Sequence, residues 1–489
     1  MSGTIRLEKL GKPGIFVITA NFAHDARSAA RDHGMPTVRL ITVPDAEYYE
    51  NRISAEKVRP VAEKAMDTII DGLIRPLTPE EAKPKAMAKE ILAPVEVTAD
   101  DDALALEKFN DLFLGNRWGD GLPLIPPTPE RVRRMLTGTS RPPHEVIGTV
   151  APKNGIATVE KIAINAVMAG AKPEYLPVII AAMEGLLDKE YDLMHPQIST
   201  GSFTFLIAVT GPIAKEIGMN SGIGLLGHGF RANNTIGRAV RLCLINLGHT
   251  WPAVNDMALD GRAVPHTFYT FAENQEYSPW KPYHVVQGYK PEDSCVTVST
   301  VGSYGRGALT AYGGGAVQAW TTESILGNIV KDIGGDRRAF AHYKRGVADY
   351  DSVLRKHIIV LHPEMAMGLK RLGYTRESLR QYIYETTRVP YEQLDQQELR
   401  GVREFVDASI AGGIRLAFML PQDRIPVFQE ALKPGGKVPV VVSPEDIIIL
   451  VAGGIPGNTL GAKFQRALYT WSSHKTKLIR GATLTQAGR

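Results

Sequence analysis

Residues Gly224–Arg241, GLLGHGFRANNTIGRAVR, form the densest run of glycine and polar side chains in the chain. They lie within Phe203–Cys295, the segment around which we expect the fold to be organised. Because glycine has no side chain, the glycines on both sides of His228 let the backbone approach a ligand closely. Their spacing matches neither a phosphate-binding loop nor a dinucleotide-binding fingerprint, so no motif names the ligand.

An apolar run at helical spacing, Ile236–Leu247, predicts a helix directly after this loop. Asparagine or threonine before such a run is typical of an N-cap. The start of a helix carries free backbone N–H groups and partial positive charge, and nearby arginines add to its attraction for anions. We therefore expect a carboxylate or phosphate of a small molecule to bind here. The predicted substrate-binding residues are Asn220, Ser221, Arg231, Asn233, Asn234, Thr235, Arg238 and, farther along the chain, Trp280.

A second polar segment, Thr267–His284, reads TFYTFAENQEYSPWKPYH. It places Glu273 and Glu276 at the end of a β-rich aromatic run, with His284 shortly after. Two carboxylates and a histidine can transfer protons or bind a divalent metal. Their spacing matches no metal motif, so the cofactor is unknown and a divalent metal stays open. The alternative is that the glutamates are solvated or form structural ion pairs with arginines of the preceding segment.

Only two cysteines occur, Cys243 and Cys295. This number argues against a disulfide framework and against a zinc site built on thiolates. Cys243 lies in an apolar helical run and is predicted to be core. Cys295 begins a strand pattern and is closer to the polar segment, so a reactive thiol is one interpretation and an inert buried thiol the other. The predicted catalytic residues are Glu273, Glu276, His284, His228 and Cys295.

The composition is that of a globular protein, with 44% hydrophobic and 22% charged residues over 489 positions. The net charge of +4 is spread along the chain without a long basic run, which argues against nucleic-acid binding. No apolar run approaches the roughly 20 residues of a membrane helix, and the start of the chain lacks a signal-peptide pattern. The expectation is a soluble cytoplasmic protein without a membrane partner.

The predicted fold class is α/β with several domains. Strands over 14–20 and 37–43 enclose a short helix, which predicts an N-terminal βαβ fragment of parallel sheet. Further strands are expected over 203–210, 357–362, 438–442 and 447–451, and a helix over 155–170. The predicted organisation is a partial α/β domain (1–75), a linker (76–99), a main substrate-binding domain (100–345), a C-terminal α/β region (346–475) and a basic, partly disordered tail (476–489). The glycine-rich loop over 302–315 is predicted to be a mobile lid, a phosphate-binding nest or a plain surface loop. The turn over 452–461 is predicted to be flexible and to form an edge of a ligand site.

Several long motifs carry a resemblance. They are GDGLPLIPPTPERV (119–132), AGAKPEYLPVIIAAMEGLLD (169–188), GMNSGIGLLGHGFRANNTIGRAVRL (218–242) and AENQEYSPWKPYHVVQGYKPEDSCVTV (272–298), together with residues 12–79. In these the chain resembles the UGSC-motif (seleno)protein family. The resemblance implies redox or nucleophilic thiol chemistry, but the chain lacks the (U/C)-Gly-Ser-Cys motif. It therefore implies either a small partner subunit that carries a CGSC-type motif or a different chemistry in this branch.

Three functions follow from these observations. The first is an acid–base lyase or hydratase that acts on a small organic anion, with Arg231, Asn233 and Arg238 binding its carboxylate. Glu276 or His284 would then transfer the proton, and His228 would orient or polarise the substrate. The second is a thiol- or selenol-linked oxidoreductase whose redox group lies on a partner, and the third is a non-catalytic ligand-binding or scaffold subunit. An oligomer is expected in each case.

Overall fold

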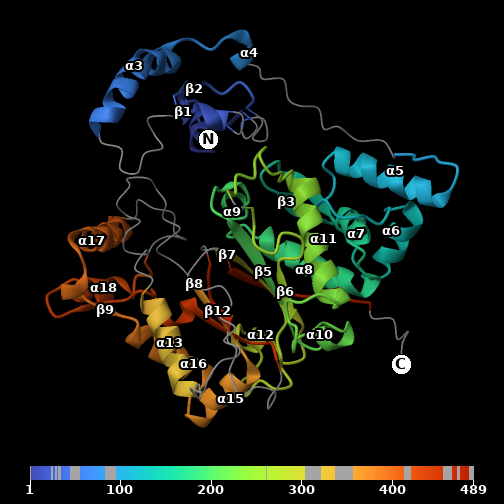
Figure 1. Ribbon diagram of the computed structural model, residues 1–489. Helices are drawn as coiled ribbons and strands as arrows, with labels where there is room; N and C mark the ends of the chain where they lie inside the picture. Colours follow the sequence, from blue (N-terminus) through green and yellow to red (C-terminus); the bar gives the residue numbers. More distant parts are fainter. Residues whose placement is uncertain are drawn as a thin grey trace, which may run out of the picture.

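The computed structural model describes residues 2–23, 26–27, 30, 35–44, 55–82, 95–259, 261–302, 321–335, 356–411, 420–454, 465–470 and 474–483. Its centre consists of two β-sheets packed against each other, with helices on the outer face of each (Figure 1). The α/β fold class predicted from the sequence is confirmed.

The first sheet has the strand order β13-β7-β5-β6. Strands β5 and β6 are parallel, whereas β7 is antiparallel to both β5 and β13. The second sheet has the order β11-β8-β12, in which β8 and β11 are parallel and β12 is antiparallel to β8. The strands are β5 (Phe203–Thr210), β6 (Tyr269–Ala272), β7 (Cys295–Gly302), β8 (Lys356–Leu361), β11 (Ile447–Val451), β12 (Gln465–Thr470) and β13 (His474–Leu478).

Alternate residues of β5 enter two different cores. Phe205, Ile207 and Val209 pack with the helices on one face, whereas Leu206 and Ala208 pack with the second sheet on the other. Successive side chains of a strand point to opposite faces, so a strand covered on both sides needs apolar residues at every position. This requirement explains the unbroken apolar run that made β5 predictable.

Strands β8 and β11 repeat this arrangement. Ile358 and Val360 face the first sheet, and Ile359 and Leu361 face the outer helices. The cluster between the sheets joins residues from the predicted regions 100–345 and 346–475, so the two regions share a buried interface. The helices are α7 (Val159–Met168), α8 (Leu176–Leu186) and α11 (Arg231–Gly248) beside the first sheet, and α13 (Thr322–Gly334), α15 (Pro363–Arg371) and α16 (Arg376–Thr386) beside the second.

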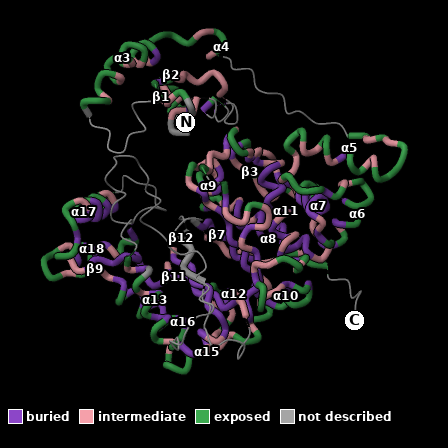
Figure 2. Tube along the Cα trace, viewed as in Figure 1, coloured by how far each residue is buried: buried purple, intermediate pink, exposed green. Residues whose placement is uncertain are grey.

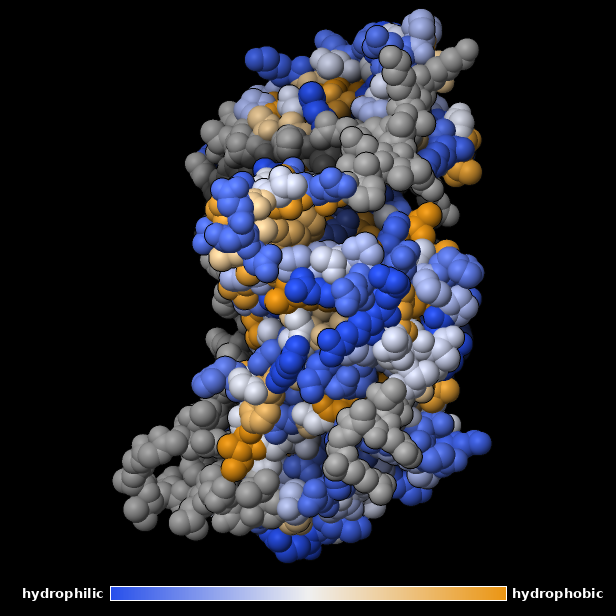
Figure 3. All heavy atoms as spheres, turned by 90° about the vertical axis from the view of Figure 1, so that its right-hand side faces the viewer, coloured by the Kyte–Doolittle hydropathy of each residue, from blue (hydrophilic) through white to orange (hydrophobic). Residues whose placement is uncertain are grey.

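The remaining elements surround this centre. A small unit with its own hydrophobic core contains β9, α17, α18 and β10. The molecular face shown in Figure 3 is mostly hydrophilic, with separate hydrophobic areas. The elements are α5 (Asp102–Gly115), α6 (Pro129–Leu136), β3 (Val146–Val150), β4 (Gly155–Thr158), α9 (Met194–Ile198), α10 (Ile213–Glu216), α12 (Tyr283–Val286), β9 (Val389–Pro390), α17 (Gln396–Ala411), α18 (Ile425–Ala431) and β10 (Lys437–Val438).

The N-terminal unit stands apart from the centre in Figure 1, and its longest helix is largely exposed in Figure 2. Its strands β1 and β2 pair in parallel, as predicted. The unit consists of α1 (Ser2–Lys9), β1 (Phe16–Thr19), β2 (Leu40–Val43), α3 (Ala55–Ile74) and α4 (Pro79–Ala82).

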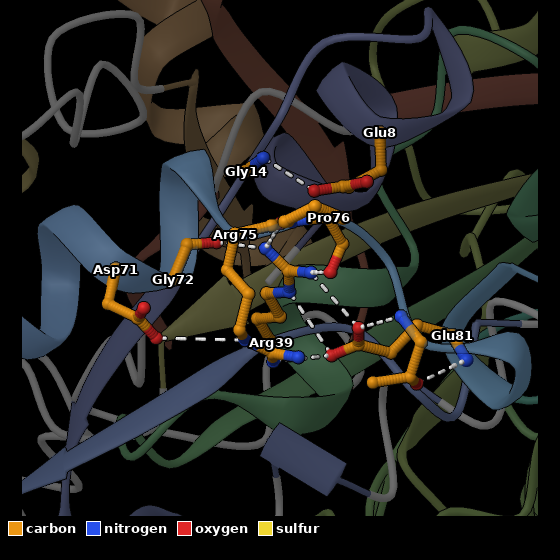
Figure 4. A network of polar contacts seen from close by, with 9 residues as sticks. Glu8, Gly14, Arg39, Asp71, Gly72, Arg75, Pro76 and Glu81 are labelled. Carbon is orange, nitrogen blue, oxygen red and sulfur yellow. Dashed lines mark hydrogen bonds and ion pairs between the residues drawn. The ribbon is translucent and has the colours of Figure 1, made fainter.

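Arg39 connects the C-terminal end of α3 to α4 through hydrogen bonds (Figure 4). Its guanidinium donates to the carbonyl oxygens of Gly72 (2.5 Å), Arg75 (2.8 Å) and Pro76 (2.9 Å). The last carbonyls of a helix have no partner within it, so Arg39 satisfies the C-terminal end of α3. Glu81 accepts two further hydrogen bonds from Arg39, which fixes α4 to the same residue. A segment predicted as part of a linker is therefore held in place at its start.

Three local predictions were wrong. Gly155–Thr158 is a strand paired with β3, and the helix predicted there begins only at Val159, because the Thr158 side chain caps it by accepting from the Lys161 N–H. The strand predicted over 438–442 ends at Val438. Residues 476–478, at the start of the tail predicted to be partly disordered, belong to strand β13 (His474–Leu478), which pairs with β7. Residues 303–320 and 455–464, in the predicted glycine-rich loops, lie outside the described residues.

Among the described residues, no helix has the length and apolar character that crossing a membrane requires.

Candidate functional site

The start of helix α11, where the sequence predicted anion binding, differs from the predicted arrangement. Helix α11 begins at Arg231, and its N-cap residue Phe230 provides no side-chain cap, so the predicted asparagine or threonine N-cap is wrong. The Asn233 amide instead accepts from the Asn220 N–H (2.8 Å) and donates to the Asn220 and Thr270 carbonyls (3.0 and 3.3 Å). Asn233 therefore joins the loop before α11 to strand β6.

The two arginines predicted to bind a substrate carboxylate make intramolecular contacts. Arg238 donates two hydrogen bonds to Asp120 (2.8 and 2.9 Å) and others to the carbonyls of Leu122 and Pro123. Burial raises the pKa of Asp120, but the hydrogen bonds and charge of Arg238 outweigh it, so the net pKa is lowered. Arg231 donates to the Gly170 carbonyl. Arg238 therefore holds the 119–125 segment against α11, and Arg231 holds the turn at Gly170 against the start of the same helix.

The other residues of the predicted binding loop lie at the carboxyl ends of two strands. The Ser221 carbonyl accepts from the Gly453 N–H just after β11 (2.8 Å), and the Asn220 carbonyl accepts from the Ala272 N–H at the end of β6 (3.3 Å). Thr235 donates its hydroxyl proton to the Arg231 carbonyl, one turn earlier in α11. Asn234 is partly exposed, whereas His228 and Glu276 are exposed. The structure thus brings Asn220 and Ser221 together and leaves His228 and Glu276 at the surface.

Two predicted catalytic residues are buried without joining a reactive cluster. Cys295 is fully buried, and burial together with Asp293 raises the pKa of its thiol to about 12. Because the thiolate is the reactive form, this environment disfavours nucleophilic chemistry. Burial also lowers the pKa of His284, against the opposing effect of the Pro291 and Lys290 backbone carbonyls.

Glu273 forms a buried ion pair at the end of β6. Its Oε1 accepts from Arg376 Nη2 (3.0 Å) and its Oε2 from the Tyr283 N–H (2.7 Å). Burial raises the pKa of Glu273, and the attraction of Arg376 opposes that rise. The Trp280 ring lies 5.8 Å from the Arg376 guanidinium, and its Nε1 donates to the Tyr374 carbonyl. The sequence identified Glu273 and Trp280 but not their partner.

A chain of three side chains lies between the two sheets, next to this pair. The Tyr283 hydroxyl is 2.9 Å from His474 Nε2, and the Ser299 Oγ is 2.5 Å from His474 Nδ1. His474 and Ser299 are direct partners in the ladder between β13 and β7. Ser299 occupies the same face of the sheet as Val301, which belongs to the cluster between the sheets. The three residues come from three separate elements, α12, β7 and β13.

The protonation of this chain is fixed by its surroundings. Burial, followed by the charges of Lys356, Lys475 and Arg380, lowers the pKa of His474 to about 3. Burial also raises the pKa of Tyr283. At neutral pH the imidazole is therefore uncharged and the phenol keeps its proton. An uncharged imidazole accepts a hydrogen bond at one nitrogen and donates one at the other.

Arg380 completes the surroundings of the chain. It lies one turn after Arg376 on α16, and its charge is close enough to shift the pKa of Tyr283 and His474 downward. The residue is only 9% exposed, and its Nε has no hydrogen-bond partner. We define the relay site as Tyr283, Ser299, His474, Glu273, Arg376 and Arg380.

Sequence reasoning missed most of the relay site. The available signal was the alternation of Thr297 and Ser299 with valines in β7, which indicates a strand with one polar stripe. Within the described residues, no cluster of three or more histidine, cysteine, aspartate or glutamate side chains is arranged to hold a metal ion. The divalent metal left open by the sequence therefore has no candidate ligand set in that part of the chain.

Comparison with known proteins identifies one region of the chain. The model of the UGSC family matches residues 1–75. Searches of curated proteins and of solved structures gave no match. The matched segment comprises α1, β1, β2 and α3 and contains no cysteine, since the two cysteines are Cys243 and Cys295. Residues 1–75 of this chain are thus similar to the UGSC family.

Proposed function

We propose that this protein is an acid–base enzyme of the lyase or hydratase type, which acts on a small organic molecule at the relay site. The observation that supports this proposal is the hydrogen-bonded chain Ser299–His474–Tyr283. Hydroxyl and imidazole groups in hydrogen-bond contact are suited to general acid–base catalysis. Elimination and hydration both require one proton to be delivered and another to be removed.

The proposed mechanism passes protons along the chain. Tyr283 gives its hydroxyl proton to the substrate and receives a proton from Nε2 of His474. Nδ1 of His474 then takes the Ser299 hydroxyl proton, and Ser299 takes a proton from the substrate or from water. Each group is uncharged before and after these transfers, which move the imidazole proton from Nε2 to Nδ1. The same transfers in the reverse direction, with water supplying and accepting the protons, restore the starting tautomer. The lowered pKa of His474 and the raised pKa of Tyr283 suit this role, because neither environment favours a stored charge.

The buried ion pair has a positioning role in this proposal. Glu273 accepts from the backbone N–H of Tyr283 while it is held by Arg376, so it fixes the start of α12 and the direction of the Tyr283 ring. Small displacements of an acid–base group cost catalytic rate, because proton transfer depends on hydrogen-bond geometry.

The thiol alternative has less support from this chain. Cys243 and Cys295 are both fully buried, and burial raises the pKa of both thiols. A redox group on a CGSC-type partner subunit is a separate proposal, motivated by the UGSC match. Native mass spectrometry of the protein from its own host tests for such a partner and for the proposed oligomer.

Two free thiols also suit the proposed cytoplasmic location, where cysteines stay reduced.

The experiment for the enzyme proposal uses deuterium exchange. The protein is incubated in D₂O with a panel of hydroxy acids and α,β-unsaturated acids, and NMR detects interconversion or deuterium incorporation. We expect Tyr283→Phe and His474→Gln to lower the rate at least about 100-fold, the usual size of an acid–base contribution. The control is Thr297→Val, which removes a hydroxyl from the same face of β7. Full turnover in both relay variants would exclude the proposed mechanism.

A further inference from the structure

Arg380 is unusual among the buried arginines of the described residues. Arg241, Arg262 and Arg376 each donate hydrogen bonds to a carboxylate or a backbone carbonyl. Arg380 donates none to the described residues, although it is nine-tenths buried. Burying a charged group without a partner is costly, and folded proteins generally pair such groups.

Nearby carboxylates do not supply the missing partner. Glu377 and Glu445 are close enough to raise the pKa of Arg380, but burial outweighs them and the net pKa is lowered. Glu445 accepts from Ser443, and its side chain is 73% exposed. Glu377 accepts from Thr375. Neither forms an ion pair with Arg380.

The neighbouring cations are already neutralised. Arg376 is paired with Glu273 (3.0 Å) and Lys356 with Asp446 (2.9 Å). Arg380 lies one turn after Arg376 on α16, and Arg376 holds Glu273, which accepts from the backbone N–H of Tyr283. The relay site therefore contains one buried positive charge for which the described residues offer no counterion.

We infer that Arg380 binds the anionic group of the substrate, a carboxylate or a phosphate, beside the Tyr283 hydroxyl. A guanidinium donates two parallel hydrogen bonds to either group, which fixes orientation as well as charge. A ligand held in this way would place its neighbouring carbon atoms next to the acid–base chain. That the bound anion is the substrate rests on the proposed function. The inference assigns anion binding to Arg380 on α16, whereas the sequence assigned it to Arg231 and Arg238.

The test measures anion binding directly, without turnover. Isothermal titration calorimetry and thermal unfolding are carried out with succinate and with inorganic phosphate on the full chain. We expect saturable binding of one probe to the wild type and at least tenfold weaker binding to Arg380→Gln. Preference for succinate indicates a carboxylate ligand, and preference for phosphate indicates a phosphorylated one. The matched control, Arg371→Gln, removes an exposed arginine from the neighbouring helix α15 and should bind as the wild type does.

Stability separates a binding role from a structural one. If Arg380 awaits a ligand, Arg380→Gln without anion should be as stable as the wild type or more stable, because a buried unpaired charge has been removed. Unchanged anion binding in Arg380→Gln, or the absence of saturable binding by the wild type, would overturn the inference. Tyr283→Phe and His474→Gln should still bind the probe. If those two variants keep full turnover while Arg380→Gln loses binding, the proposed function fails and the anion site stands.

Discussion

Ser299 and His474 face each other across β7 and β13, with 2.5 Å between Oγ and Nδ1. The pair connects a central strand to a strand at the edge of the sheet. His474 also contacts Tyr283, so this one residue joins the edge strand, the central strand and α12. The following predictions test what this connection and the neighbouring contacts contribute.

His474 should make the protein sensitive to acid. Its pKa is lowered from 6.5 to about 3 by folding, so between these values the unfolded state binds a proton that the folded state does not. Stability is therefore complete above pH 6.5 and falls as the pH decreases towards 3. We expect a loss of about 1–3 kcal/mol between pH 7 and pH 4.5 from this residue. Urea unfolding at several pH values measures the loss.

The variant His474→Gln should be less sensitive to pH over that range, because glutamine does not titrate. The exposed residue His228 provides the control, and His228→Gln should keep the wild-type pH dependence. Equal pH dependence in His474→Gln and wild type would show that the acid sensitivity has another origin.

Glu273 and Arg376 should be strongly coupled. Removing one partner of a buried ion pair leaves the other charge unpaired and costs about 3–5 kcal/mol. We therefore expect Glu273→Gln and Arg376→Met each to lower the free energy of unfolding by that order. The double variant should recover much of the loss, which a double-mutant cycle measures by denaturant unfolding. Additive losses in the double variant would contradict the coupling.

Arg238 and Asp120 should affect stability rather than ligand binding. Asp120 accepts two hydrogen bonds from Arg238, and its side chain is 3% exposed. Asp120→Asn keeps the shape but removes the charge, so we expect a loss of about 1–3 kcal/mol in the free energy of unfolding. Succinate and phosphate affinities should stay unchanged. A stable Asp120→Asn variant with strengthened anion binding would instead support the anion site predicted from the sequence, because Arg238 would then be released to bind the anion.

Arg39 should protect the N-terminal unit from proteolysis. Its contacts to Gly72, Arg75, Pro76 and Glu81 hold the end of α3 and the following turn. We expect Arg39→Ala to be cleaved near residues 72–82 at least about tenfold faster, since losing these hydrogen bonds costs about 1–3 kcal/mol locally. Limited proteolysis followed by mass spectrometry locates the cuts. Arg59→Ala, on the exposed part of α3, is the control and should be cleaved at the wild-type rate.

The sequence predicted the buried strands well because their apolar runs reflect burial on both faces. Residues 203–210, 357–362 and 447–451 were all identified in this way, each within about one residue of the observed strand. The relay site was harder to predict, because its members are far apart in the chain. Ser299 and His474 meet when β13 pairs with β7, and Tyr283 reaches His474 from α12, so no local spacing encodes these contacts.

Strand β13 shows why an edge strand escapes prediction. Its sequence, HKTKL, has little apolar character, and lysines are typical of sheet edges. Pairing with β7, rather than intrinsic preference, makes the segment a strand. The intramolecular partners of the predicted substrate arginines, Asp120 for Arg238 and the Gly170 carbonyl for Arg231, were also not predictable from local sequence. The sequence shows that Arg238 is present, but only the folded structure shows that it is already paired with Asp120.

The position of β13 also affects the order in which the protein can become functional. His474 follows every other member of the relay site in the chain, so it is translated after all of them. Chains generally begin to fold from the N-terminal side during synthesis. The two sheets can therefore start to assemble while the acid–base chain is still missing its central imidazole. A protein built in this way cannot complete the proposed site before β13 has been synthesised, so chains that stop before β13 lack its central residue.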